Sequence, residues 1–367
     1  MRLMSRDSLR VACLVLAWMA LADWAIGVAL KPDARRFPEL QRYFEYGRSI
    51  EGKLFHMMTG LRDGRILSAG WIDQEQLKQL PSKAKPGSDL LVAAYGQSFT
   101  LNAVNGAASI DQGLTLRNIG GPGAPASHSY WAYRADAPLR RADVVVFGVL
   151  SSTVGQLASM SGLISMFENP APFTYPRYRM VAGRLEEELP RIRSEAEFRA
   201  AFAARSTQWQ AFERQLEASD KGYDAFTFSE SWIDASTVGR LVRRGWVAHR
   251  RDYDDGVYSP EQGFDPDSEE VRALRQILLE LDAATRSRGE RLIVLLLHTQ
   301  GHSDRLHAVL KDELRAARVE YLSTHALFSA NDPGNFLPDG HYAPLASEAL
   351  SRELRNLIRR RAAAPAR

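Results

Sequence analysis

Five short apolar segments alternate with amphipathic segments along much of the chain. The amphipathic segments at residues 268–288 and 307–317 have a helical pattern and precede the last two apolar segments. Short apolar runs bounded by turn residues are typical of buried strands, and strands that alternate with helices are typical of a parallel sheet. The pattern therefore predicts an α/β fold whose sheet is covered by helices on both faces. The predicted strands are residues 90–94, 114–119, 144–149, 292–297 and 319–322.

A long insertion separates the third predicted strand from the fourth, at about residues 153–266. It contains helical patterns at residues 195–218 and 234–249, and a patch rich in aromatic residues and proline at residues 170–178. An insertion of this length is typical of a lid or a substrate platform. A helical cap that only covers the sheet fits the pattern equally well.

The N-terminus carries a different pattern. Residues 11–30 are apolar except for Asp23, and three arginines precede them. A helix of this length spans the hydrocarbon core of a bilayer, and the run is longer than the apolar region of a typical signal peptide. We therefore predict an uncleaved signal anchor that crosses the inner membrane once and leaves the following domain in the periplasm. Asp23 could contact a partner helix, since a carboxylate inside a membrane is costly, although a place near the outer interface fits slightly better.

These patterns divide the chain into four predicted parts. They are the anchor at residues 1–30, a juxtamembrane helical linker at 31–88, an α/β domain at 89–361 and a disordered tail at 362–367.

The composition argues against two classes of protein. The chain has 47 Lys and Arg against 44 Asp and Glu, a net charge of +3, and it lacks a long basic stripe. Nucleic-acid binding is therefore not predicted. The single cysteine, Cys13, lies in the predicted span, so a disulfide scaffold is not predicted either.

Ser98 directly follows the first predicted strand and precedes a helical pattern at residues 99–108. A serine at a strand-to-helix turn directs its hydroxyl into the crevice at the carboxyl edge of the sheet, where α/β enzymes carry out their chemistry. Taken alone, such a serine is more often a helix N-cap than a nucleophile. Other parts of the chain have to decide between the two.

Two further blocks change that balance. Residues 118–126, after the second strand, are rich in glycine, which lets backbone N–H groups approach an oxyanion. Asp339 and His341 lie on a loop just before the final helical pattern at residues 344–358, and one intervening residue lets the carboxylate orient the imidazole. With Ser98, they supply the hydroxyl, imidazole and carboxylate that nucleophilic acyl transfer needs, and this chemistry requires no cofactor.

These blocks, in this order, resemble those of the SGNH/GDSL hydrolase superfamily, and the resemblance covers most of residues 89–358 apart from the insertion. It implies a three-layer, flavodoxin-like sandwich with a five-stranded parallel sheet. It also implies that Ser98 is the nucleophile and an oxyanion donor, that Gly123 is the oxyanion glycine, and that His341 and Asp339 are the base and its orienter.

The chain departs from the family in two places. Gln97 stands where an aspartate usually precedes the serine, which matters little because that residue is not the nucleophile. The block at residues 147–153 lacks the usual oxyanion asparagine, and losing one such donor costs about 2.7–4 kcal/mol in the transition state. Ser151 or Ser152 could replace it. Strand alternation allows only one of them to face Ser98, and we predict Ser152.

Three other residues are candidates for substrate binding. His298 follows the fourth predicted strand, at the same sheet edge as the site. His302 lies four residues later, but the glycine and strand context argue against a metal site. Tyr130 and Trp131 follow the glycine block and could stack on a sugar; packing under the insertion is an equal alternative.

The sequence thus predicts a serine esterase or O-acyltransferase that works through an acyl-serine. Resemblance to anchored members of the superfamily that edit exopolysaccharide acetylation implies O-acetyl groups of an envelope or extracellular polysaccharide as substrate. The expected partners are this carbohydrate ester, the membrane and a membrane-bound acyl donor. Two alternatives remain: a catalytically degenerate glycan-binding or scaffold protein on the same fold, and a lipid esterase.

Overall fold

The computed structural model describes residues 6–29, 43–61, 64–250 and 256–360, and the chain divides into two compact units. The N-terminal unit comprises Met1–Gly64, Met166–Pro170 and Tyr223–Arg251. The sheet unit comprises Arg65–Ser165, Ala171–Gly222 and Asp252–Arg367. The long insertion is therefore shared between the two units.

The sheet unit is built on a five-stranded sheet in which every pairing is parallel. Its strand order, β2-β1-β3-β8-β9, is the flavodoxin-like order of a doubly wound fold. All five predicted strands are confirmed, with ends that differ by one or two residues. The strands are β1 (Leu90–Gly96), β2 (Leu114–Gly120), β3 (Val144–Leu150), β8 (Arg291–Leu297) and β9 (Glu320–Ser323).

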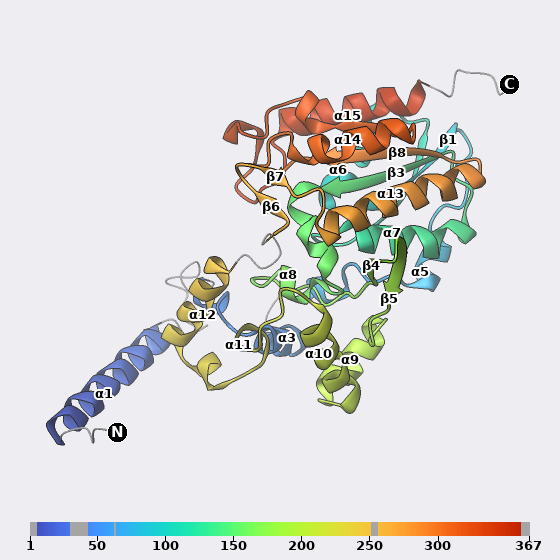
Figure 1. Ribbon diagram of the computed structural model, residues 1–367. Helices are drawn as coiled ribbons and strands as arrows, with labels where there is room; N and C mark the ends of the chain where they lie inside the picture. Colours follow the sequence, from blue (N-terminus) through green and yellow to red (C-terminus); the bar gives the residue numbers. More distant parts are fainter. Residues whose placement is uncertain (1–5, 30–42, 62–63, 251–255, 361–367) are drawn as a thin grey trace. The chain divides into compact units, whose positions relative to one another are not determined.

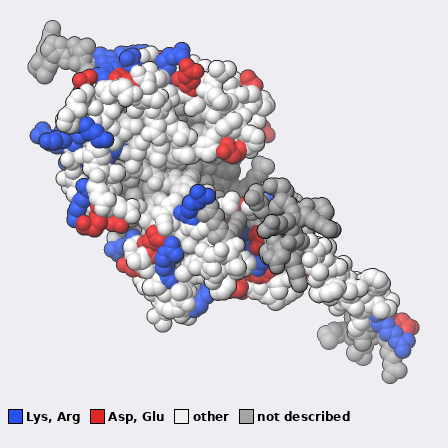
Figure 2. All heavy atoms as spheres, turned by 180° about the vertical axis from the view of Figure 1, so that it is seen from behind, with Lys and Arg blue, Asp and Glu red and all other residues white. Residues whose placement is uncertain are grey.

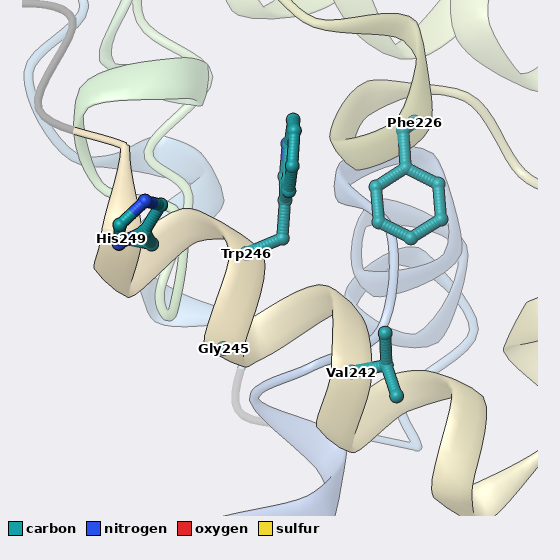
Figure 3. A pocket seen from close by; sticks show the side chains of 5 residues that line it. All are labelled: Phe226, Val242, Gly245, Trp246 and His249. Atoms are coloured by element: carbon teal, nitrogen blue, oxygen red, sulfur yellow. The ribbon is translucent and has the colours of Figure 1, made fainter.

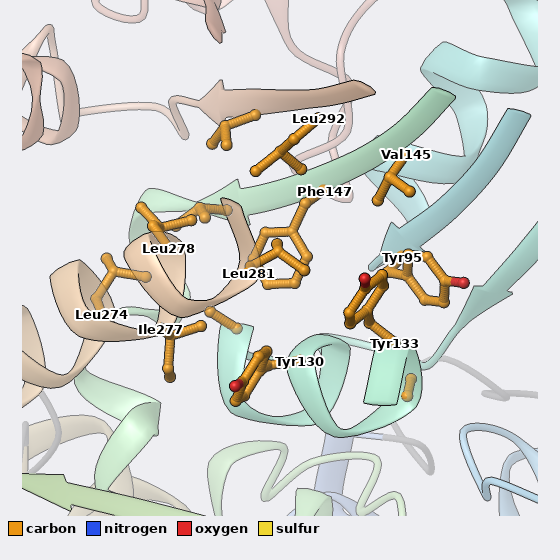
Figure 4. Close-up of a cluster of buried hydrophobic side chains, with 14 of the residues drawn as sticks. Tyr95, Tyr130, Tyr133, Val145, Phe147, Leu274, Ile277, Leu278, Leu281 and Leu292 are labelled. Atoms are coloured by element: carbon orange, nitrogen blue, oxygen red, sulfur yellow. The ribbon is translucent and has the colours of Figure 1, made fainter. Parts of the chain in front are cut away.

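Helices cover both faces of this sheet, so the predicted three-layer α/β fold is confirmed (Figure 1). Alternate residues of each strand face opposite sides: Val144 and Val146 pack with one cluster, whereas Val145 and Phe147 pack with the other (Figure 4). The first face carries α6 (Ser98–Ile110) and α15 (Pro344–Arg359). The second face carries α7 (Ala126–Asp136), α13 (Glu269–Ser287) and α14 (Arg305–Ala316).

The helix predicted at residues 195–218 is two helices. Arg205 has a φ of 46°, which no helix interior tolerates, and Ser206 caps the second helix by accepting a hydrogen bond from the Trp209 N–H. The aromatic patch is buried in this region, with Phe173 and Tyr175 inaccessible to solvent. The remaining elements of the sheet unit are α4 (Arg65–Ser68), α5 (Gln74–Gln79), α8 (Gly162–Ser165), β4 (Arg177–Val181), β5 (Arg184–Glu188), α9 (Glu195–Ala203), α10 (Thr207–Ser219), β6 (Tyr258–Ser259) and β7 (Gly263–Phe264), with short 3-10 turns at Ala137–Leu139, Ser151–Thr153, Gly155–Ala158, Thr324–Ala326 and Pro333–Asn335.

The N-terminal unit is helical. It contains α1 (Arg6–Ala29), α3 (Ile50–Met58), α11 (Ala225–Phe228), the 3-10 turn η4 (Trp232–Ala235) and α12 (Thr237–His249). The stretch Arg10–Ala29 of α1 is long and apolar enough to cross a membrane, and none of it is buried. In Figure 2 the charged colours visible on α1 lie at its N-terminal end. Residue 30 at the end of the predicted anchor, residues 31–42 of the predicted linker and the predicted disordered tail lie outside the described residues.

Candidate active site

Ser98 is the first residue of α6 and lies at the carboxyl edge of the sheet, directly after β1. Two glycines allow this placement. A Cβ added at Gly96 or at Gly148 would overlap the side chain of Thr100, in the first turn of α6. Only glycine at the ends of β1 and β3 therefore lets the helix begin so close to the sheet, and this close approach holds Ser98 over the strand ends.

The structure brings Ser98, His341 and Asp339 together, although 243 positions separate the serine from the histidine. Ser98 Oγ lies 2.7 Å from His341 Nε2, and His341 Nδ1 lies 3.2 Å from Asp339 Oδ2. A carboxylate beside Nδ1 favours the tautomer with its proton on that nitrogen, which leaves Nε2 free to accept the serine proton. This is the arrangement of a nucleophile, a base and a group that orients the base.

A tight loop before α15 places the histidine and the aspartate. Phe336 and Tyr342 form an antiparallel bridge, and Gly340 turns the chain between them with a φ of 85°. The backbone N–H of His341 donates to Asp339 Oδ1 at 3.1 Å. This hydrogen bond, together with the imidazole, holds the pKa of the exposed Asp339 carboxyl below its usual value, so the group stays ionised.

The imidazole of His341 is also held from the side. It stacks on the ring of Phe99 with a centroid distance of 4.7 Å and an interplanar angle of 17°. Phe99 is buried and directly follows the serine, so the same helix turn positions both reacting side chains. This contact was not predicted from the sequence, because nothing in the local pattern shows which residue the distant loop will cover.

The predicted oxyanion donors Gly123 and Ser152 follow β2 and β3, the two strands that pair with β1. Gly123 has a φ of 57° in the turn between β2 and α7, a conformation that favours glycine. Ser151 is buried and turned toward the loop after β8, where its Oγ accepts a hydrogen bond from the Thr299 N–H at 2.9 Å. Ser152 is exposed. Its hydroxyl thus stays the predicted third donor, whereas Ser151 serves the neighbouring loop.

The prediction that His298 binds substrate is wrong. Its side chain is inaccessible to solvent, and burial together with the nearby His325 and His307 lowers its pKa to about 4. Its Nε2 accepts a hydrogen bond from the backbone N–H of His307 in the first turn of α14, at 3.4 Å, and its Nδ1 lies 3.2 Å from Thr324 Oγ1. His298 therefore joins α14 to the sheet as a neutral residue.

The same prediction is wrong for Tyr130, which is buried in the cluster between the sheet and α13 (Figure 4). Its hydroxyl donates to Glu280 at 2.9 Å, and its ring packs against Tyr178 of the insertion. The packing alternative was the correct one for this residue. Trp131 is half-buried, and its role stays a prediction. Among the described residues, no group of three or more His, Cys, Asp or Glu could hold a metal ion.

The fold and the site define a doubly wound α/β protein with a hydroxyl, imidazole and carboxylate aligned at the carboxyl edge of its sheet. No family model and no curated protein matches the sequence. Solved structures with a similar fold include a candidate acylhydrolase from Bacteroides fragilis NCTC 9343, with 11% identity, a TM-score of 0.37, and 78% of this chain and 93% of that chain covered.

Two others are a GDSL-like lipase from Bacteroides thetaiotaomicron VPI-5482 and an α/β hydrolase enzyme from the metagenome of Lake Arreo, Spain. The lipase shows 8% identity and a TM-score of 0.38, with 77% of this chain and 94% of that chain covered. The hydrolase shows 10% identity and a TM-score of 0.36, with 74% and 96% covered. Similarity at this level carries no argument about activity, which has to rest on the site.

Proposed function

We propose that the sheet unit is a serine esterase or O-acyltransferase of the SGNH/GDSL type. The observation that carries this proposal is the alignment of Ser98 Oγ, His341 and Asp339, at 2.7 Å and 3.2 Å. The alternative role of Ser98, that of a helix N-cap, does not apply, since the N-cap of α6 is Gln97. A serine hydroxyl directed at an imidazole whose other nitrogen meets a carboxylate is the arrangement that activates a nucleophile.

The reaction then proceeds in two acyl transfers. Ser98 Oγ bonds to the ester carbonyl carbon while His341 Nε2 takes the serine proton, and the carbonyl electrons move to the oxygen. Backbone N–H groups of Ser98 and Gly123 and the hydroxyl of Ser152 stabilise this oxyanion. The intermediate collapses, the carbon–oxygen bond to the leaving alcohol breaks, and His341 returns its proton to that alcohol.

The acyl-serine is next attacked by water or by a sugar hydroxyl, whose proton His341 accepts. Collapse of the second intermediate frees Ser98, which regains its proton from His341, and releases an acid or a new ester. Asp339 remains a carboxylate throughout and stabilises the imidazolium. None of these steps calls for a group beyond these side chains and backbone N–H groups.

The substrate part of the proposal is an O-acyl group, in particular O-acetyl, on an envelope or extracellular polysaccharide, with a membrane-bound acyl donor as partner. It is supported by the resemblance of the sequence blocks and by the apolar stretch Arg10–Ala29. In this view residues 1–30 anchor the protein in the inner membrane and residues 89–361 work in the periplasm. A reporter fused to the C-terminus should be active only outside the cytoplasm.

One specific observation favours a second candidate, a catalytically degenerate glycan-binding protein. The segment Val144–Leu150 and the following turn contain no asparagine, and the exposed hydroxyl of Ser152 is its only proposed replacement. Binding needs no activated serine, so labelling by a fluorophosphonate separates the two candidates.

The decisive experiment is labelling and ester hydrolysis with the full-length protein in detergent. Ser98→Ala should abolish fluorophosphonate labelling and lower turnover by about 10³-fold or more, His341→Ala nearly as much, and Asp339→Asn less. Ser109→Ala is the matched control, because Ser109 is an exposed serine of the same helix and should leave both readouts unchanged. Full labelling of Ser98→Ala would remove the serine from the mechanism, and absent labelling of a folded wild type would favour the glycan-binding candidate.

The same assay separates the two serines after β3. Ser152→Ala should lower kcat by about 100-fold with little change in KM, the signature of an interaction made in the transition state. Ser151→Ala should lower the melting temperature instead, because it leaves the Thr299 N–H without its acceptor. An unchanged kcat in Ser152→Ala would exclude this residue from the oxyanion hole.

A further inference from the structure

Helix α12 in the N-terminal unit is amphipathic, but it buries charged side chains and exposes apolar ones, the opposite of a surface helix on a water-soluble protein. Its charged residues Arg240 and Arg243 are buried. Several of its apolar residues are exposed: Val242 is 60% accessible and Trp246 is 45% accessible. A surface helix ordinarily buries its apolar stripe and turns its charges to water. The medium next to the outer face of α12 is therefore not expected to be water.

The buried face of α12 is held by ion pairs within the unit. Arg243 Nη1 lies 2.9 Å from Asp234 Oδ1, and its Nε donates to the Phe226 carbonyl at 2.7 Å. Arg240 is paired with Glu45. Buried charges of this kind are costly unless each has a partner, and here each does. The orientation of the helix is thus fixed by specific pairs and is not an accident of loose packing.

The exposed face is continuous and apolar. An open hollow of about 550 Å³ lies on it, lined by five residues that Figure 3 shows: Phe226, Val242, Gly245, Trp246 and His249. Two more apolar residues of the same unit are exposed outside the hollow. Leu241 is 37% accessible, and Trp232, in the turn before α12, is 81% accessible. Exposed tryptophan beside aliphatic residues is typical of segments at the membrane–water interface.

Helix α1 places this face at a defined level. Asp23 Oδ1 accepts a hydrogen bond from the Val238 N–H at 2.7 Å and another from the Ser236 hydroxyl at 3.1 Å. Ser236 is the N-cap of α12, and Asp23 adds a second acceptor at this helix end. The two helices also meet at Gly27, where an added Cβ would lie 3.3 Å from Thr237 Oγ1. The first turn of α12 is therefore attached to the last third of the apolar helix.

The position of Asp23 sets the depth. It precedes the end of α1 at Ala29 by six residues, about 9 Å along the helix axis. An interfacial helix lies with its apolar face about 5–10 Å into the boundary between headgroups and acyl chains, which is the same depth. A carboxylate at this level needs hydrogen-bond partners, and the free N–H groups at the start of α12 supply them.

We propose that α12 lies in the bilayer interface on the side where α1 ends, with Leu241, Val242 and Trp246 among the lipid acyl chains. This inference rests on the proposed membrane anchor and extends it: the N-terminal unit contacts the membrane through a second, in-plane helix. The lipid is favoured over a protein partner because the contacts at Asp23 and Gly27 attach the start of α12 to the apolar helix that is proposed to cross the membrane.

The test places a reporter on that face in the full-length protein, reconstituted in vesicles of phosphatidylethanolamine and phosphatidylglycerol. In a Cys13→Ser background, Val242→Cys and Trp246→Cys are labelled with an environment-sensitive fluorophore. Quenching by iodide in the water and by lipids carrying a nitroxide near the headgroup is then compared. Ile110→Cys is the matched control, since Ile110 is an exposed apolar residue of the sheet unit and is 47% accessible. The native Cys13, labelled in the otherwise unchanged chain, reports on the anchor.

The expected result is a blue-shifted emission at positions 242 and 246, strong quenching by the nitroxide lipid and protection from iodide, with the reverse at position 110. If Cys13 is quenched by lipid while positions 242 and 246 stay open to iodide, α12 is not interfacial and the anchor alone stands. If those positions are shielded from iodide but not quenched by lipid, a second copy of the chain covers them and the lipid assignment is overturned. If Cys13 is not quenched by the nitroxide lipid, the proposed membrane anchor itself is overturned, and the proposal for α12 with it.

Discussion

Helices α12 and α13 are both amphipathic, yet they bury opposite faces. In α13 the buried residues Leu274, Ile277 and Leu278 pack against the sheet, whereas Arg286 is exposed. In α12 the buried residues are Thr237, Arg240 and Arg243, and Val242 is exposed. The two helices show that periodicity defines which residues share a face, but the neighbours of the helix decide which face is buried.

The two helices are also held in place by different interactions. Apolar packing holds α13, and its contribution grows with the area removed from water. Paired charges hold α12, and such pairs add little net stability, because desolvation offsets their attraction. Breaking one pair is costly all the same, since the remaining charge is left buried. The largest predicted effects therefore fall on the arginines of α12 and on the leucines of α13.

The strongest test of the comparison is Arg243→Leu. The change leaves Asp234 buried without its cation and removes the hydrogen bond to the Phe226 carbonyl, so we expect a loss of about 3–5 kcal/mol in the stability of the N-terminal unit. Hydrogen exchange of residues 223–250 in detergent measures this locally. Arg286→Leu is the control: its pair with Asp282 lies on the surface, so the cost should stay below about 1 kcal/mol. Equal effects would mean that α12 is not held by its buried charges.

The second test shortens one apolar side chain in each helix to alanine. Leu278→Ala removes a fully buried side chain from the core of the sheet unit and should cost about 2–5 kcal/mol in urea unfolding. Val242→Ala in α12 should change stability in detergent by less than about 0.5 kcal/mol, because that side chain packs against no protein core. A large loss from Val242→Ala would show that the apolar face of α12 packs inside the protein.

The third test uses acid. The sheet unit buries His298 and His128, and burial lowers the pKa of each to about 4, whereas the described part of the N-terminal unit buries no histidine. In the unfolded chain these histidines bind protons as the pH falls through 6.5, whereas in the folded chain they stay neutral down to about pH 4. The free energy of unfolding is therefore unaffected by them above pH 6.5 and decreases as the pH falls from 6.5 to 4. The loss should be about 3 kcal/mol for each histidine.

Urea unfolding at pH 7 and at pH 4.5 measures this loss, and His298→Asn should reduce the difference between the two. Asp111 acts in a separate range: Arg359 lowers the pKa of its carboxyl from 3.8 to about 2, so its contribution is lost only between those values. An unchanged pH dependence in His298→Asn would mean that this histidine is protonated in the folded protein.

The sheet and the aligned triad were predictable because both rest on local signals. Each strand is a short apolar run between turn residues, and carboxyl ends of parallel strands meet at one edge. Ser98 and the loop of Asp339 and His341 each follow from their own neighbours, since a strand precedes the first and a helix follows the second. The strand order and the 2.7 Å contact between Ser98 and His341 came only with the structure.

The failures have a shared physical cause. His298 was placed at the correct sheet edge and Tyr130 after the glycine block. Position along the chain does not say whether a side chain points into the crevice or into the core. The reversed orientation of α12 was hidden for the same reason: the partners of its arginines include Glu45, 195 positions away from Arg240. The contact of Asp23 with α12 was not predictable either, because its partner Val238 lies 215 positions away.

The last test concerns the hydrogen bond between Asp23 and α12. Asp23→Ala removes the acceptor for the Val238 N–H and should destabilise α12 by about 0.5–2 kcal/mol, as loss of a cap does. Asp23→Asn keeps an acceptor oxygen and should cost much less, which distinguishes a hydrogen bond from a charge effect. Ser268→Ala is the counterpart in α13, whose cap is the neighbouring serine with Val271, and it should cost a similar amount within the sheet unit. Hydrogen exchange of residues 237–249 reports on the first two variants. If Asp23→Ala leaves that exchange unchanged, α12 is held in place without α1, and the depth assigned to its apolar face loses its basis.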